Sequence, residues 1–411
     1  MKASILPRYL LGSRQAILEA AASRGLLLVG AMFVLSAGFA REYDGEDLIH
    51  EPWHMLRPLG ASLITGTTLF LIVHLAALLK RGKGEGTPPS FIKSWGLFLG
   101  LFWLTAPMAW LYAIPYERFM SPVDAIQVNL WTLAIVAAWR VGLMTRVISV
   151  LYGIGYVSSF FLVMLFADVL AFIVVTLIPT PVIDVMGGIR HSERDALIAN
   201  VTFLVTFLSF ISAPVWIIGA LVASGVLKPK WPDLSVTADT GRSRSMLILA
   251  AVSIVAFVPL LLMSQPVQIN RNEAELLLKQ GKVADALAIM SDRSQDDYPP
   301  HWNPPPKLGY RESSPSLDAV REAMYAQRPS DWVAAIYVAK IDRRLREGIA
   351  FFWTHGSWTE IVERLTEYGG LDEIDPEHGL AAQFLLDYQS SLNEADRMAL
   401  EQIVQFASPS D

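Results

Sequence analysis

Long apolar stretches with few charges alternate with short polar stretches through the first two thirds of the chain. A helix that crosses a lipid bilayer needs about 20 consecutive apolar residues. Seven stretches meet this requirement, at residues 20–40, 58–79, 95–114, 122–144, 148–178, 199–223 and 246–263. The pattern therefore predicts a polytopic domain of seven transmembrane helices over residues 1–263, with the lipid bilayer as its first partner.

Local signals mark the fourth stretch and the joint that follows it. Ser121, Pro122 and Asp124 have the residue types and spacing of a helix N-terminus. Arg140 and Arg146 flank the predicted joint between the fourth and fifth helices. Arg140 is therefore expected near the cytoplasmic end of its helix, where its long side chain reaches the membrane surface.

The pattern changes after Met263. Residues 264–411 have the polarity of a soluble domain, with apolar positions at helical spacing behind helix-start residues such as Ser357, Asp375 and Asn393. This predicts a separate all-α domain over residues 264–411. A short polar segment, SQPVQINRN, is expected to link it to the last membrane span.

The first part of this domain, NEAELLLKQGKVADALAIMS, predicts a helical hairpin that turns at Gly281. It resembles one hairpin of a tetratricopeptide-type (TPR) repeat. The resemblance covers about twenty residues and does not recur about 34 residues later, where Pro304–Pro306 lie. The resemblance therefore implies a hairpin in a weakly TPR-like domain and no repeat array.

Composition and charge support this division of the chain. Charged residues make up 18% of the sequence, against about 25% in ordinary soluble proteins, and mean hydropathy is +0.39. Residues 1–263 hold 19 basic and 15 acidic residues, a net charge of +4, whereas the remainder holds 14 and 24, a net charge of −10. An acidic soluble domain argues against nucleic acid as a partner. The absence of cysteine excludes disulfides and thiolate chemistry, and no sequence motif indicates a cofactor.

The distribution of basic residues predicts the orientation in the membrane. Cytoplasmic loops carry an excess of Lys and Arg. The N-terminal side of the seven-span arrangement has 14 basic residues and the opposite side has five: Arg41, Arg57, Arg118, Arg190 and Arg194. This predicts a protein of the bacterial cytoplasmic (inner) membrane with a cytoplasmic N-terminus. The C-terminal domain is then extracytoplasmic, and periplasmic if the cell has two membranes.

One short motif suggests a metal. His50-Glu51-Pro52-Trp53-His54 matches the H-E-x-x-H pattern of zinc proteases, which needs both histidines one turn apart on a helix and the Glu as general base. Pro52 conflicts with this requirement because proline is tolerated only in the first turn of a helix. No metal site is predicted, and a collar of polar and aromatic side chains at the outer interface is favoured.

Three ionisable residues fall within predicted spans: His74, Arg140 and Asp168. Such residues are functional candidates because burying a charge in lipid is costly. His74 and Arg140 are expected to share a level near the cytoplasmic side, with Asp168 further out. A hydrogen bond from a Ser or Thr of a neighbouring span to Asp168 is the favoured interpretation, and an ion or substrate site is the alternative.

A Pro-rich stretch in the soluble domain, DDYPPHWNPPPKLGY, predicts an extended backbone carrying Tyr298, Trp302 and Tyr310. These aromatic residues are candidate anchors for a protein partner. The alternative is that the stretch packs across the helices of its own domain and buries Trp302.

No motif in the sequence specifies a reaction, so an enzyme is the less favoured class. The favoured function is an integral membrane subunit or scaffold that displays a helical interaction domain to protein partners in a membrane complex. The first alternative is a transporter or channel component that uses Asp168 with Arg140 and His74. A membrane metalloprotease acting through His50, Glu51 and His54 is a distant alternative.

Overall fold

The computed structural model describes residues 2–78, 90–177, 193–230, 244–308, 314–349, 356–368, 370–389 and 391–407. The described chain is about 80% helical and contains no strand, which confirms the predicted all-α class. The protein divides into two compact units. One comprises Met1–Pro179 and Asn200–Gln268, and the other comprises Thr180–Ala199 and Ile269–Asp411.

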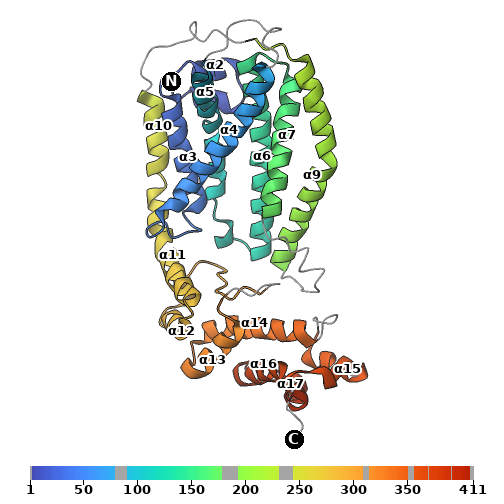
Figure 1. The fold of residues 1–411 in the computed structure, drawn as a ribbon. Coiled ribbons are helices and arrows are strands. Elements are labelled where there is room, and N and C mark those ends of the chain that lie inside the picture. Colours follow the sequence, from blue (N-terminus) through green and yellow to red (C-terminus); the bar gives the residue numbers. More distant parts are fainter. Residues whose placement is uncertain are drawn as a thin grey trace. The chain divides into compact units, whose positions relative to one another are not determined.

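The first unit is a bundle of long apolar helices (Figure 1). Six helical segments of the described chain are long and apolar enough to cross a membrane, or seven if the bent pair α2–α3 counts as one. Each of the seven predicted spans overlaps one of these segments. The helices are α1 (Ile5–Leu10), α2 (Arg14–Ala21), α3 (Leu26–Glu42), α4 (Arg57–Leu78), α5 (Phe91–Trp103), α6 (Pro122–Tyr152), α7 (Tyr156–Leu177), α9 (Glu193–Val226), α10 (Arg244–Val255) and α11 (Val258–Lys279). The short 3₁₀ segments are η1 (Pro52–Leu56), η3 (Ala106–Ala113) and η4 (Tyr116–Arg118).

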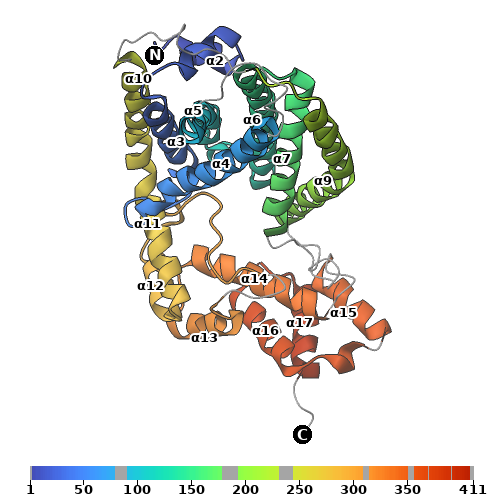
Figure 2. The same cartoon turned by 45° about the horizontal axis from the view of Figure 1, so that its top comes forward.

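The first predicted span is broken, because α2 and α3 meet at an angle of 110°. Gly25, directly before α3, has φ +84°, a left-handed conformation that interrupts a helix. The segment before the break lies against the bundle, with α2 beside α5 and α6 (Figure 2). There the Tyr9 hydroxyl donates to the carbonyl of Leu101 at 2.6 Å, and the Trp139 indole donates to the carbonyl of Leu10 at 2.9 Å.

The joint between the fourth and fifth spans lies further along the chain than the sequence suggests. Ser121 caps α6 as predicted, but the helix continues through Arg140 to Tyr152 and ends at Gly153, which has φ +61°. A Cβ atom at Gly153 would lie 2.3 Å from the carbonyl oxygen of Lys230, so only glycine fits there. Arg140 therefore lies 12 residues before the end of α6, roughly 18 Å along the axis. Arg140 thus lies further from the end of its helix than the sequence predicts.

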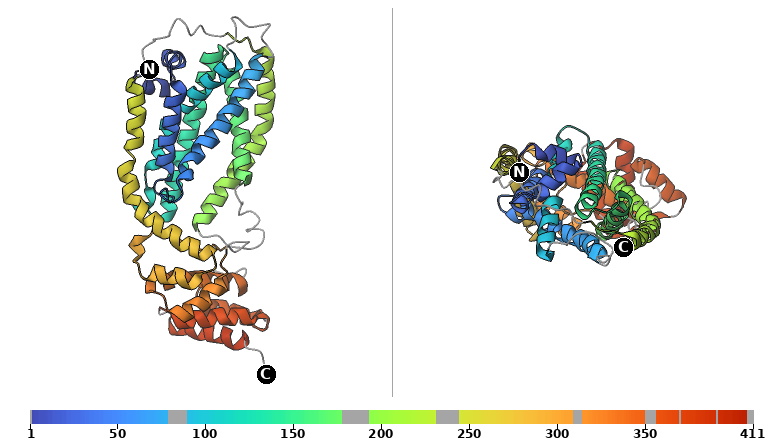
Figure 3. Two further views of the ribbon diagram at one scale, coloured as in Figure 1. Left: turned by 60° about the vertical axis from the view of Figure 1, so that its left-hand side comes forward. Right: turned by 90° about the horizontal axis from the view of Figure 1, so that it is seen from above.

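The second unit has its own apolar core, centred on fully buried side chains that include Tyr337, Trp358 and Phe384. Its first hairpin turns at Gly281, which has φ +75°, as predicted. The later helices begin at side-chain caps: Ser357, Asp375 and Asn393 each accept a hydrogen bond from the amide three residues on. The remaining helices are α12 (Val283–Ser291), α13 (Leu317–Gln327), α14 (Asp331–Ile349), α15 (Trp358–Glu367), α16 (Pro376–Tyr388) and α17 (Glu394–Ala407), seen at the red end of the chain in Figure 3.

The predicted polar linker is helical instead. SQPVQINRN lies inside α11, with Pro266 in the helix, and the chain passes from the first unit to the second at Gln268–Ile269 within this same helix. The side chains of Ser264, Gln265 and Gln268 are buried in the first unit. Polar residues are tolerated at buried positions when their hydrogen bonds are satisfied, and the partners of these three side chains belong to the loop described below.

The Pro-rich stretch is attached to α14 in the second unit. The ammonium or amine of Lys340 donates to the carbonyls of Pro304 and Pro306, and the Tyr337 hydroxyl donates to the carbonyl of Pro305 at 2.9 Å. Burial, with a smaller effect from the charge of Lys307, lowers the pKa of Lys340 from 10.5 to about 7. The unfolded chain therefore binds more protons than the folded one between about pH 7 and pH 10.5. Stability rises with pH across this window, and the cost of the buried charge is fully present below it.

Candidate functional site

The H-E-x-x-H residues do not form a zinc-protease site. Pro52 begins η1, so His50 lies before the helical turn that carries His54. His50 is exposed and its Nδ1 lies 2.7 Å from the carboxylate of the buried Asp47. His54 is only 5% exposed and its Nε2 lies 3.0 Å from the Glu51 carboxylate. The two histidines thus have different partners, as the position of Pro52 indicates, and the protease interpretation is not supported.

The loop between α3 and η1 is held by side chains from α11. Gln265 is 1% exposed; its amide group donates to the carbonyls of Tyr43 and Glu46, both at 3.1 Å, and its oxygen accepts from the Leu48 amide at 2.7 Å. Gln268 donates to the carbonyl of Asp44 at 2.6 Å. A loop without regular secondary structure must satisfy its buried backbone groups by other means. Here side chains of α11 supply the hydrogen-bond partners, and these bonds fix the course of residues 43–48.

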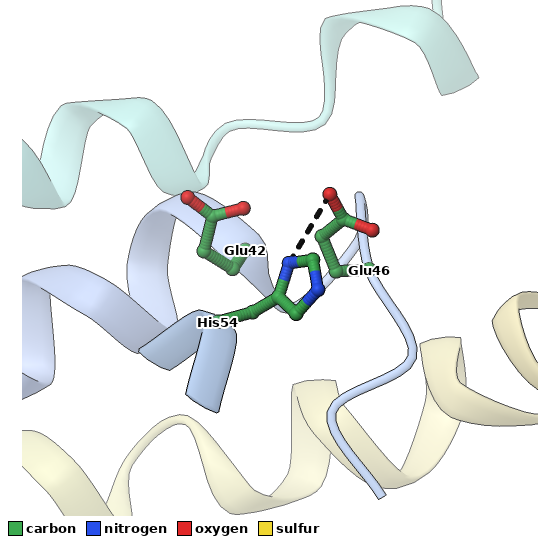
Figure 4. A group of neighbouring side chains, drawn as sticks. All are labelled: Glu42, Glu46 and His54. Carbon is green, nitrogen blue, oxygen red and sulfur yellow. Dashed lines mark ion pairs between the residues drawn. The ribbon is translucent and has the colours of Figure 1, made fainter. Parts of the chain in front are cut away.

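This loop brings three potential metal-ligating side chains together. Glu42 at the end of α3, Glu46 in the loop and His54 in η1 each offer one ligand atom, and these atoms all lie within 4.8 Å of one another (Figure 4). His54 Nδ1 lies 3.3 Å from a Glu46 carboxylate oxygen, yet it is buried and has no hydrogen-bond partner. Two arginines, Arg41 and Arg57, approach the carboxylates from the exposed side, at 3.5 Å from Glu42 and 3.9 Å from Glu46.

Asp168 has the neighbour that the favoured interpretation requires. It lies on α7, and the Ser212 hydroxyl of α9 donates to its carboxylate at 3.0 Å. A hydrogen bond of this kind satisfies a polar side chain inside a helix bundle. Asp168 therefore joins α7 to α9, and its presence needs no transported ion as an explanation.

His74 is buried on α4 within an aromatic group. Its ring stacks on Phe70 with centroids 4.7 Å apart, and the Tyr152 hydroxyl lies 3.5 Å from its Nδ1. Tyr152 ends α6, 12 residues after Arg140. His74 and Arg140 are thus separated by roughly 18 Å along α6, and the expectation that they share a level is wrong. Among the described contacts, His74, Arg140 and Asp168 share no residue.

Among these three residues, Arg140 is the one whose charge has no carboxylate partner within the described chain. Its guanidinium lies over the Phe102 ring, 4.4 Å from the centroid, and its electrostatic neighbours are Tyr112 and Tyr9. Within the described chain, no carboxylate pairs with Arg140 and its buried Nε has no hydrogen-bond partner. A cation–π contact stabilises such a charge by only about 0.5–2 kcal/mol, so the described residues compensate the charge of Arg140 incompletely.

A pocket of about 270 Å³ opens beside the α3–η1 loop. It is lined by residues from the end of α3, from the segment around η3 and η4, and from the first half of α6: Arg41, Tyr43, Asp44, Gly45, Tyr112, Ile114, Pro115, Glu117, Asn129 and Leu133. Asp44 pairs with Arg118, and the Asn129 amide donates to Glu117 at 2.8 Å. Tyr112, an electrostatic neighbour of Arg140, is one of the residues that line this pocket, whereas Arg140 itself is not.

The aromatic residues of the Pro-rich stretch pack within the second unit. Tyr298 is 3% exposed, and its ring stacks on Trp302 with centroids 4.6 Å apart. The half-buried Trp302 donates its indole N–H to Glu275 at 3.0 Å. Tyr298 is therefore a core residue that offers almost no surface to a partner, and the arrangement favours packing across the unit's own helices. Tyr310 lies outside the described residues.

Comparison of the chain with protein-family models, with curated proteins and with solved structures finds no match. The candidate sites are therefore judged by geometry alone. Sequence reasoning identified His54 and Glu51 but missed Glu42 and Glu46, because acidic residues near the end of an amphipathic segment carry no distinctive signal. The i, i+4 spacing of these two glutamates ahead of His54 is the one hint that the sequence contains.

Proposed function

We propose that the protein is an integral membrane subunit or scaffold that displays a helical domain for protein interaction outside the cytoplasm. One observation carries this proposal: the chain combines a bundle of apolar helices with a second compact unit that has its own complete core. The weakly TPR-like character of this second unit is part of the proposal and rests on the sequence of its first hairpin. A domain of this kind can bind partners without any catalytic group.

The charge distribution supports the proposed topology. Moving Arg140 and Arg146 from a loop into α6 lowers the count on the N-terminal side from 14 to 12, against five on the other side, so the asymmetry remains. With seven spans, in which α3 alone provides the first crossing, the second unit lies outside the cytoplasmic membrane, in the periplasm of a two-membrane bacterium. α3 has 17 residues, the lower end of the length needed for a span.

Reporter fusions at the C-terminus test this topology. A reporter active only outside the cytoplasm should be active there, and one active only in the cytoplasm should be silent. The reverse pattern would place the second unit in the cytoplasm and overturn the proposal.

Photo-crosslinking tests the interaction. Tyr368, Leu380 and Met398 are large apolar side chains of the second unit that are more than half exposed. A photoreactive amino acid at each position, activated in native membranes, should give protein adducts from at least one of them. The same residue at the exposed Phe210 of α9 serves as the control, because it is expected to react with lipid. Absence of protein adducts at all three positions would contradict the scaffold function.

Arg140 favours a second candidate function, the binding or transport of a small anionic solute. The supporting observation is that no described carboxylate compensates its charge inside the apolar bundle, and that its electrostatic neighbour Tyr112 lines a pocket. Phosphate, sulfate and small dicarboxylates should raise the melting temperature of the purified protein, and Arg140→Gln should abolish the increase. If no anion in the panel stabilises the wild-type protein more than Arg140→Gln, this candidate is excluded.

A further inference from the structure

The group formed by Glu42, Glu46 and His54 belongs neither to the interaction domain nor to the surroundings of Arg140. It joins two carboxylates with a histidine nitrogen that is buried and lacks a hydrogen-bond partner. We propose that these three residues bind a divalent transition-metal cation of the Zn²⁺ class. The ligands would be one oxygen from each glutamate and Nδ1 of His54.

The orientation of His54 is the main argument. Its Nε2 lies 3.0 Å from the Glu51 carboxylate, whereas its buried Nδ1 lies within 4.8 Å of carboxylate oxygens of Glu42 and Glu46 and makes no hydrogen bond. A metal ion held by all three ligand atoms would satisfy this nitrogen and join the two carboxylates. Histidines that bind metals commonly donate their second ring N–H to a carboxylate in this way. Glu51 is thus a positioning residue, and the protease motif contributes an orienting group in place of a general base.

The distances agree with this assignment. For bond lengths of about 2.0–2.2 Å, two ligand atoms of a tetrahedral zinc ion lie about 3.4 Å apart. The distance between His54 Nδ1 and Glu46 Oε1 is 3.3 Å, and the largest separation within the group is under 4.8 Å. A change in the glutamate side-chain torsions would bring the remaining separations to tetrahedral values, since carboxylate torsions are broad.

The ligand types select the class of metal. A histidine with two carboxylates suits Zn²⁺ and neighbouring divalent metals such as Mn²⁺, whereas Ca²⁺ and Mg²⁺ prefer all-oxygen sites. Three protein ligands leave at least one position for water. Because the ligands come from α3, the loop and η1, the bound ion would join these three segments at one end of the bundle.

Metal analysis of the full-length, tag-free protein in detergent tests this inference. The protein is treated with a chelator, loaded with Zn²⁺, desalted and analysed for zinc, and its affinity is measured by competition with a chromophoric chelator. The expected result is one tightly held Zn²⁺ per chain. Glu51→Gln should lower the affinity by about 10–100-fold, as loss of an orienting carboxylate does. His54→Ala and Glu46→Gln should lower it by at least as much.

His50→Ala is the matched control, because His50 lies in the same motif but pairs with Asp47 away from the group. It should retain the wild-type zinc content and affinity. Zn²⁺ should also slow amide hydrogen exchange over residues 43–54 in the wild-type protein and in His50→Ala, but not in His54→Ala. The hydrogen-exchange measurement requires only that the His54→Ala protein elutes as a folded species. If it does not, Glu46→Gln replaces it, because this substitution is almost isosteric.

Two results would overturn the proposal. Equal zinc binding by the wild-type protein and His54→Ala would show that the metal is held elsewhere. A folded wild-type protein that takes up no Zn²⁺ would show that the three side chains do not form a metal site.

Discussion

Replacing Gln265 by Ala tests how the α3–η1 loop is held. The substitution removes the acceptor of the Leu48 amide and a donor to the carbonyls of Tyr43 and Glu46. Tyr43 keeps a second donor, the Ser264 hydroxyl, so the clearest loss falls on the Leu48 amide. A buried backbone group left without a partner costs about 1–3 kcal/mol. Opening of the loop should therefore become easier by roughly 1–3 kcal/mol.

Hydrogen exchange measures this effect directly, because the amide of Leu48 is itself one of the groups that loses its partner. A cost of about 1–3 kcal/mol for that group alone corresponds to roughly 5- to 150-fold faster exchange of a peptide containing Leu48. Gln268→Ala is the control, since it removes only the hydrogen bond to Asp44 and leaves the Leu48 amide paired. If exchange at Leu48 is unchanged in Gln265→Ala, or accelerates equally in Gln268→Ala, the clamp by α11 is not what holds the loop.

Three further substitutions have defined outcomes. Lys340→Met should abolish the rise in stability between about pH 7 and 10.5, which in the wild-type protein approaches about 1.4 kcal/mol per pH unit. Hydrogen exchange in α14, corrected for intrinsic rates, measures this pH dependence. Equal dependence of stability on pH in the wild-type protein and the variant would refute the assigned pKa. Asp168→Asn keeps an acceptor for the Ser212 hydroxyl and should change the melting temperature by the equivalent of less than about 1 kcal/mol. A large loss of stability or of an anion flux would show instead that the charge of the carboxylate is essential. Trp302→Ala should destabilise the second unit by about 2–3 kcal/mol, which is less than the loss of a fully buried Trp because this ring is half-buried. Denaturant titration measures this loss, and unchanged stability would make Trp302 a candidate anchor for a partner again.

The fold class and the positions of the apolar helices could be predicted because they depend on local periodicity and length. The joint at Gly153 could not, since the contact that requires glycine comes from Lys230, far along the chain. The depth of Arg140 was misjudged for the same reason, because its position follows from where α6 ends.

The polar segment of α11 shows a second limit. Ser264, Gln265 and Gln268 have the composition of a linker, and only their distant partners in the loop after α3 make them buried helix residues. The candidate metal group is missed in the same way. Its ligands become recognisable when the loop course is known, whereas the sequence alone points to His50, which the structure pairs with Asp47.

The contacts of the N-terminal segment impose an order on synthesis. Tyr9 bonds to Leu101 and Leu10 accepts from Trp139, so the first ten residues acquire these partners only after 92 and 129 further residues have been made. At about 5–20 residues per second, the second partner appears roughly 6–26 s after the segment itself. Until then the buried ring of Tyr9 has no place in the bundle. The amino-terminal helices therefore dock on the bundle late in synthesis, and the break at Gly25 lets them do so without a change in the direction of α3.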